Sequence, residues 1–82
     1  MKNTWNYRLM LDDSGKQKIY SFHEVYYEGG DTPTEFTKMP ETMMSEDPEE
    51  LIFKIEGFLR AFEEPIISIN NFPQEVHDHE DL

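Results

Sequence analysis

Aromatic residues and leucines occupy every second position of residues 4–12, namely Trp5, Tyr7, Leu9 and Leu11. A period of two is typical of a β-strand that buries one of its faces. A turn signal follows from Asp12 to Gly15, because Asp side chains bond the nearby backbone and glycine accepts unusual backbone angles. Residues 17–28 are then rich in β-branched and aromatic side chains. The pattern predicts a β-hairpin at the start of the chain.

Two shorter strands are expected further along the chain. A Gly-Gly turn at residues 28–31 leads to a weak strand over residues 33–39, and the prolines at both of its ends are typical of an edge strand. Residues 66–69 form a short last strand. The remaining residues, 70–82, contain four acidic residues and no Lys or Arg, so we expect them to form a disordered tail.

The hydrophobic period changes to that of an α-helix after residue 47. Asp47 is a suitable N-cap, Pro48 suits the first helical position, and Pro65 stops the helix. Gly57 is unfavourable inside a helix, so it indicates close packing on the sheet. Phe53 is the large apolar residue that we expect this helix to expose. The stripe that we expect to face the sheet consists of Leu51, Ile52, Ile55, Phe58, Leu59 and Phe62.

Together these elements predict an α+β fold. We expect a three- to four-stranded antiparallel sheet with one α-helix packed on one face, in the order β-β-β-α with an optional final β-strand. A single domain is expected over residues 1–69, followed by the acidic tail over residues 70–82.

The charge is distributed unevenly over the 82 residues. Eighteen acidic and seven basic residues give a net charge of −11, yet residues 1–30 carry four of each. The excess therefore lies in residues 31–82, where it repels nucleic acids and membranes and favours a basic protein partner. The chain lacks cysteine, which excludes disulfides and thiolate chemistry. Without an apolar run or leader of the required length, we expect a cytoplasmic protein.

The sequence contains no catalytic motif that we can identify. His23 and Glu24 are neighbours on a strand, so their side chains point to opposite faces and cannot form an acid–base pair. His77 and His79 lie among carboxylates in the tail, which lacks the rigid frame that a metal site needs. We therefore predict no catalytic residue, no metal, no cofactor and no enzymatic activity. A small ligand-binding or enzymatic domain around His23, with Tyr27 and Arg8, is one alternative.

Surplus aromatic residues and acids favour a protein-interaction surface. One helix covers only one face of the sheet, so aromatic side chains of the second strand are expected on the open face. The candidate partner-binding residues are Tyr20, Phe22, Tyr26, Phe53, Glu49, Glu56, Glu63 and Glu64. We predict a non-enzymatic, acidic interaction module, inhibitory or regulatory, that binds a basic protein surface. A homodimer through the open sheet face is an alternative.

Three short sequence motifs carry a resemblance to other proteins. Trp5-Asn6-Tyr7-Arg8, His23-Glu24-Val25-Tyr26-Tyr27 and the helix start Glu49-Glu50-Leu51 resemble the pattern of a group of small uncharacterised bacterial proteins. The resemblance covers residues 4–69 and implies the same strands and helix, but no activity. Acidic phage inhibitors that mimic DNA resemble the chain only in size and charge, which gives a further alternative, a DNA-mimic inhibitor of a nucleic-acid-binding protein.

Overall fold

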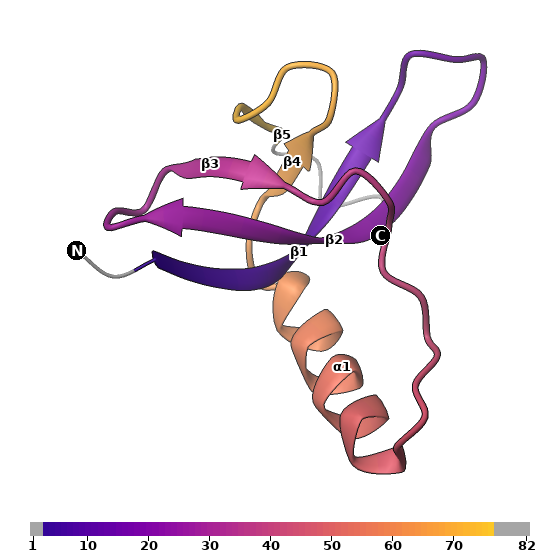
Figure 1. Cartoon of the computed structure of the whole chain (residues 1–82). Helices are drawn as coiled ribbons and strands as arrows, with labels where there is room; N and C mark the ends of the chain where they lie inside the picture. Colours follow the sequence, from indigo (N-terminus) through magenta and orange to yellow (C-terminus); the bar gives the residue numbers. More distant parts are fainter. Residues whose placement is uncertain (1–2, 77–82) are drawn as a thin grey trace.

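The computed structural model describes residues 3–76, which form a curled five-stranded mixed sheet and one α-helix (Figure 1). The sheet has the strand order β3-β2-β1-β4-β5. The predicted α+β class is confirmed, although the sheet has more strands than expected and one parallel pair. The elements are β1 (Asn3–Asp12), β2 (Ile19–Glu28), β3 (Pro33–Phe36), α1 (Pro48–Ala61), β4 (Ile66–Ser68) and β5 (Glu75–Val76).

The predicted hairpin is confirmed as the largest unit of the sheet. β1 and β2 pair antiparallel in one unbroken register, from Asn3 opposite Glu28 to Asp12 opposite Ile19. At the turn, the Asp12 carboxylate accepts hydrogen bonds from the backbone N–H of Ser14, at 3.0 Å, and from its hydroxyl, at 2.7 Å. These bonds lower the pKa of Asp12 because they favour its charged form. The turn chemistry that the sequence indicates is therefore present.

β4 is parallel to β1, with Ile67 opposite Met10, so the expectation of a fully antiparallel sheet was wrong. β2 already pairs with one edge of β1. After α1 the chain runs along the other edge of β1, in the same direction as β1. All three residues of β4 are buried. A short run without polar alternation is typical of a strand covered on both faces, which is common among parallel strands.

Residues 70–76, which we expected to belong to the disordered tail, continue the fold. Phe72 packs against the buried cluster of Met10, and β5 pairs antiparallel with β4. The carboxylate of Glu75 lies 3.5 Å from the guanidinium of Arg8. The rest of the predicted tail, residues 77–82, lies outside the described residues. The predicted tail boundary was therefore at least seven residues too early, because the apolar anchors Phe72 and Val76 are scattered among polar neighbours.

Both faces of the sheet are covered near β2. On one face, odd-numbered residues of β2 lie beside even-numbered residues of β1. The buried cluster on this face consists of Met10, Val25, Tyr27 and Ile67, and it is covered by Phe36, Ile69 and Phe72. The other face holds a second cluster, which consists of Leu9, Leu11 and Ile66 beside Tyr20, Phe22 and Val76. The sheet therefore buries its helix-free face against its own loops, and the open aromatic face expected from the sequence is absent there.

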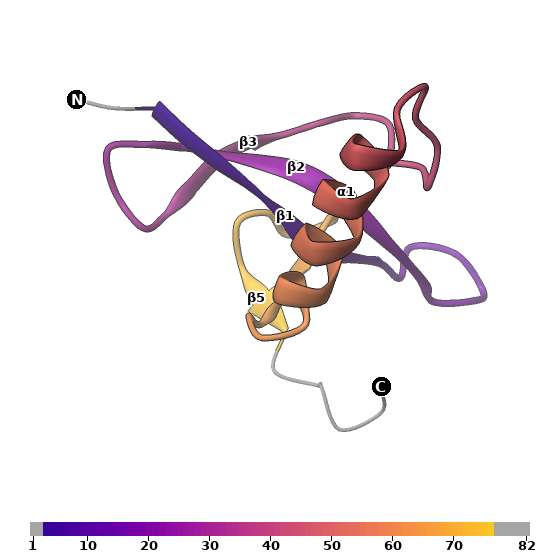
Figure 2. The same ribbon diagram turned by 90° about the horizontal axis from the view of Figure 1, so that it is seen from below.

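The side of α1 that contacts the sheet differs from the side predicted from the sequence. Its buried residues are Gly57, Phe58 and Ala61, and the ring of Phe58 stacks on Phe22 with 4.2 Å between ring centroids. A Cβ atom on Gly57 would lie 2.5 Å from Cδ2 of Tyr7, so the close packing predicted at this glycine is confirmed. The helix crosses β1 and extends beyond the sheet (Figures 1 and 2). Of the six residues predicted to face the sheet, Ile52, Ile55 and Leu59 are exposed instead. Phe58 is buried, Leu51 is half-buried, and the partly exposed ring of Phe62 lies edge-on to Phe22, with 5.6 Å between ring centroids.

The contact at Gly57 gives a prediction of stability. We expect Gly57→Ala to lower the free energy of unfolding by about 1–2 kcal/mol, because overpacking against Tyr7 outweighs the better helix propensity of alanine. Urea denaturation measures the change. In a Tyr7→Leu background the same substitution should be neutral or stabilising. Stabilisation by Gly57→Ala in both backgrounds would contradict the close approach.

Candidate functional site

Three large apolar residues of α1, together with Phe62 at its C-terminal cap, are partly exposed to solvent. Ile52, Ile55, Leu59 and Phe62 are 57%, 44%, 62% and 44% exposed, and we call them the apolar stripe. Their spacing of three, four and three residues places them on one side of the helix. This side is nearly opposite to Gly57 and Ala61, which contact the sheet. The rotation that buries the glycine therefore turns the apolar stripe outward.

An acidic row runs beside the apolar stripe. Glu49, Glu56 and Glu63 are seven residues apart and all are exposed. Glu49 and Glu56 lie almost in line along α1, and Glu63 continues the row in the turn beyond the helix end, where its N–H donates to the carbonyl of Arg60. At 100° per residue, this row is adjacent to Ile52 and Leu59. No ion pair joins these three carboxylates to another described residue. A molecule that covers the apolar stripe would therefore meet a line of negative charge along one side.

Exposed methionines extend the apolar surface at the start of α1. Met39, Met43 and Met44 are all exposed, and Met43 and Met44 line a hollow of about 500 Å³ together with Leu51. The ammonium of Lys54 fixes this loop by donating to the carbonyls of Thr42, at 3.1 Å, and Met44, at 2.8 Å. Methionine side chains are flexible and polarisable, so they adapt to the shape of a partner.

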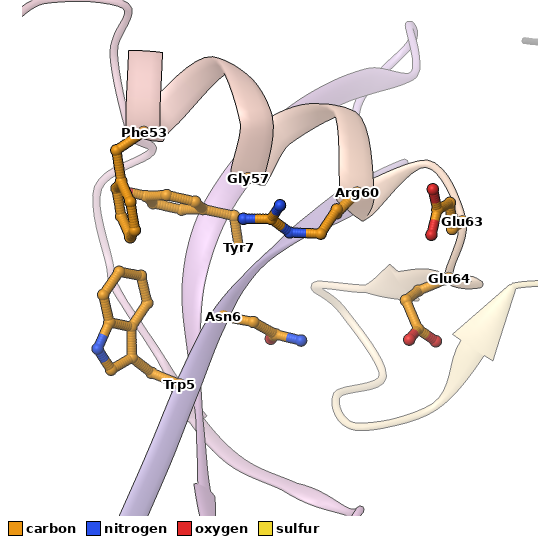
Figure 3. A pocket seen from close by; sticks show the side chains of 8 residues that line it. All are labelled: Trp5, Asn6, Tyr7, Phe53, Gly57, Arg60, Glu63 and Glu64. Carbon is orange, nitrogen blue, oxygen red and sulfur yellow. The ribbon is translucent and has the colours of Figure 1, made fainter. Parts of the chain in front are cut away.

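A second hollow, of about 490 Å³, lies on the other side of the acidic row (Figure 3). Trp5, Tyr7 and Phe53 form its aromatic end, with ring centroids 5.2–6.3 Å apart in edge-on arrangements. We call this hollow the aromatic notch. Trp5 is 43% and Phe53 is 51% exposed. Figure 3 shows Glu63 and Glu64 at the opposite end, with the side chain of Arg60 extended between the two ends toward Tyr7.

The structure separates the predicted partner-binding residues into two groups. The first group lies on α1 or directly after it and is exposed: Phe53, Glu49 and Glu56 on the helix, and Glu63 and Glu64 just beyond its last residue. The β2 aromatics form the second group and are half-buried. Phe22 lies under Phe58, and the hydroxyl of Tyr26 donates to Glu24 at 2.6 Å. That bond raises the pKa of Tyr26 because it favours the protonated phenol. Tyr20 packs beside the cluster of Leu9 and Leu11.

Sequence reasoning missed the apolar stripe and the aromatic notch. The apolar stripe was identified as a helical pattern but assigned to the core. The pair Gly57 and Ala61 was the available signal, because small residues four positions apart mark the helix side on which a neighbour approaches most closely. Trp5 was placed on β1 correctly. Its contact with Phe53 depends on where the helix crosses the strand, which periodicity does not give.

Arg8, His23 and Tyr27 do not form one site. Arg8 is buried and donates to the hydroxyl of Tyr27, at 3.0 Å, and to the carbonyl of Pro65, at 2.7 Å. Arg8 and Tyr27 line a polar hollow of about 400 Å³ in which His23 takes no part.

The buried His23 instead ties β2 to the segment that follows β3. Its Nδ1 lies 2.7 Å from the carbonyl oxygen of Thr37 and its Nε2 lies 2.9 Å from the hydroxyl of Ser21. Because a carbonyl only accepts, Nδ1 carries a proton and donates to Thr37, and Nε2 shares a hydrogen bond with the hydroxyl of Ser21. Both ring nitrogens are thus used in holding the sheet together.

Within residues 3–76, no group of three or more His, Asp or Glu side chains is arranged to hold a metal ion. The tail histidines His77 and His79, which were considered as metal ligands and not predicted to form a site, lie outside those residues. The described part of the chain also contains no helix that is long and apolar enough to cross a membrane.

Comparisons of the chain with protein-family models, with curated proteins and with solved structures found no match. The functional argument therefore depends on the geometry of α1 and its surroundings.

The outward rotation of α1 gives a second prediction of stability. We expect Leu59→Gln to change the free energy of unfolding by no more than about 0.5 kcal/mol, because the side chain is exposed and both residues favour helix. Phe58→Ala, one position away, should lower the free energy of unfolding by about 3 kcal/mol or more, because it removes the ring that stacks on Phe22 and leaves a cavity there. Thermal or urea unfolding measures both. Similar losses for the two variants would show that Leu59 is part of the core.

Proposed function

We propose that this protein is a non-enzymatic interaction module that binds a basic partner protein through the exposed side of α1, with an inhibitory or regulatory effect. One observation carries the proposal. The helix buries its small residues, Gly57 and Ala61, and presents the apolar stripe to solvent beside the acidic row.

The exposure of the apolar stripe is a source of binding energy. Complete burial of a Leu, Ile or Phe side chain contributes about 1.5–3 kcal/mol. Each residue of the apolar stripe is roughly half exposed, so a partner that covers all four gains several kcal/mol before the costs of association. Amphipathic helices that bind in grooves use anchors at this spacing. The apolar stripe therefore favours a partner with an apolar groove.

The acidic row determines the charge of that partner. Glu49, Glu56 and Glu63 would line one rim of the groove, and the net charge of −11 attracts a basic surface over a longer range. A second copy of the chain would bring the same charge and the same row of carboxylates, so repulsion disfavours a homodimer. A surface that mimics DNA needs carboxylates but no apolar stripe. The arrangement thus favours a groove lined by apolar residues and rimmed by Lys or Arg.

Capture from the native host with matched variants tests the proposal. We expect the wild-type protein to retain one specific partner, and Leu59→Gln to reduce its retention about tenfold through the loss of one central anchor. Reversal of Glu56 and Glu63 to lysine should abolish retention. Ile19→Gln is the control because Ile19 is 59% exposed on β2, away from the helix. It should retain the partner, and binding of the purified pair should weaken as salt increases.

Four results would contradict the proposal. Equal retention of the partner by Leu59→Gln and Ile19→Gln would exclude the apolar stripe as the surface that binds the partner. Binding that is insensitive to both salt and charge reversal would exclude a basic partner. Competition by duplex DNA for the same partner, with no effect of Leu59→Gln, would indicate DNA mimicry. A stable dimer of the pure protein that Leu59→Gln dissociates would make a second copy the occupant of the apolar stripe.

A further inference from the structure

The aromatic notch is adjacent to the acidic row but is separate from the apolar stripe. Around the helix, Phe53 lies about 100° from Ile52, and the acidic row lies between these two directions. A partner that covers the apolar stripe and pairs with the acidic row would therefore have a further side chain within reach of the aromatic notch. The residues that line the aromatic notch indicate which side chain that is.

The aromatic end of the notch offers ring faces and edges to a ligand. Trp5 and Phe53 each expose about half of their surface, and their ring centroids lie 6.2 Å apart. The ring of Tyr7 lies behind them, 5.2 Å from Trp5 and 6.3 Å from Phe53. Aromatic faces attract cations that come within about 6 Å of the ring centroid. This end therefore suits a flat cation better than a neutral aliphatic group.

The other end of the notch is negatively charged. Glu63 and Glu64 line it, and both follow the last residue of α1. Carboxylates accept two parallel hydrogen bonds from a guanidinium, which a spherical ammonium cannot supply. The chain already places a guanidinium of its own in the hollow, because Arg60 lies between the aromatic and acidic ends (Figure 3).

We propose that the aromatic notch receives an arginine side chain of the partner protein. Its guanidinium stacks against Trp5 or Phe53 and pairs with Glu63, while Arg60 moves out toward solvent. This assignment rests on the proposed docking of α1 and names the partner residue that the notch selects. Lysine is disfavoured because its ammonium is more strongly hydrated and cannot form the planar double contact.

The single tryptophan of the chain provides a direct reporter, because Trp5 forms one wall of the notch. The probe is acetyl-Gly-Arg-Gly-amide, compared with the same peptide containing citrulline, which is neutral and nearly the same shape, or lysine. We expect the arginine peptide to change Trp5 fluorescence in a saturable way, with a Kd of about 1 mM. The citrulline and lysine peptides should bind at least several-fold more weakly.

Matched variants locate the binding at the notch. Phe53→Leu should weaken the arginine peptide about two- to fivefold, because the apolar volume remains and the cation–π contribution is lost. Ile19→Val is the control, since Ile19 is an exposed apolar residue on β2 that lies outside both the notch and the apolar stripe. Arg60→Gln should tighten binding more than Lys38→Gln does. Both variants remove one positive charge, but only Arg60 lines the notch.

The absence of a saturable Trp5 response in both the wild-type protein and Arg60→Gln would overturn the proposal. Equal binding of the arginine and citrulline peptides, or of the arginine and lysine peptides, would also overturn the choice of arginine. Equal effects of Phe53→Leu and Ile19→Val would place the peptide elsewhere. In the capture experiment, the partner could be lost with Leu59→Gln but fully retained with Phe53→Leu. This result would show that the partner does not use the aromatic notch, and it would still support binding through the apolar stripe.

Discussion

The close approach of Gly57 to the ring of Tyr7 is the constraint on which the exposed surface of the protein depends. Any side chain at position 57 would need the space that the Tyr7 ring occupies, since a Cβ atom would lie 2.5 Å from Cδ2. The helix can therefore come this close to β1 only on its glycine side. Phe58 and Ala61, which adjoin that side, complete the contact. Because side chains follow one another at 100° around the axis, burial of Gly57 and Ala61 directs the apolar stripe into solvent.

Polar contacts from its middle and just beyond its end hold the helix in this orientation, although few of its residues are buried. From the middle of α1, the ammonium of Lys54 binds two carbonyls of the loop that precedes the helix. Just beyond the end of α1, the buried Arg8 binds the carbonyl of Pro65 and lies against Glu75 of β5. The sheet meanwhile fills both of its faces with its own residues. The apolar stripe is thus not needed for the core and is presented by a fixed helix, which lowers the entropy cost of binding a partner.

The sequence predicted local structure well and long-range packing poorly, for physical reasons that individual residues show. Periodicity identified the hairpin, and Asp47 and Pro48 marked the start of the helix, because these signals depend on neighbouring residues. The side of α1 that faces the sheet was assigned wrongly, because hydrophobicity alone favoured the apolar stripe over two small residues. β5 was missed because its contacts with β4 and Arg8 join segments far apart in the chain. In the candidate site, Phe53, Glu56 and Glu63 were predictable as exposed residues. The hollow beside Trp5 was not, because it forms only where α1 crosses β1.

The order of features around α1 restricts the partner more than any one feature does. The acidic row lies between the apolar stripe and the aromatic notch, so a partner that contacts both must also bury or approach those carboxylates. Burying a carboxylate without a partner costs several kcal/mol, and a wholly apolar surface would incur this cost at Glu56 and Glu63. A wholly basic surface would leave the apolar stripe in water. Only a surface with apolar groups on one side and cationic groups on the other satisfies both conditions, so the acidic row provides selectivity by excluding partners of either simpler kind.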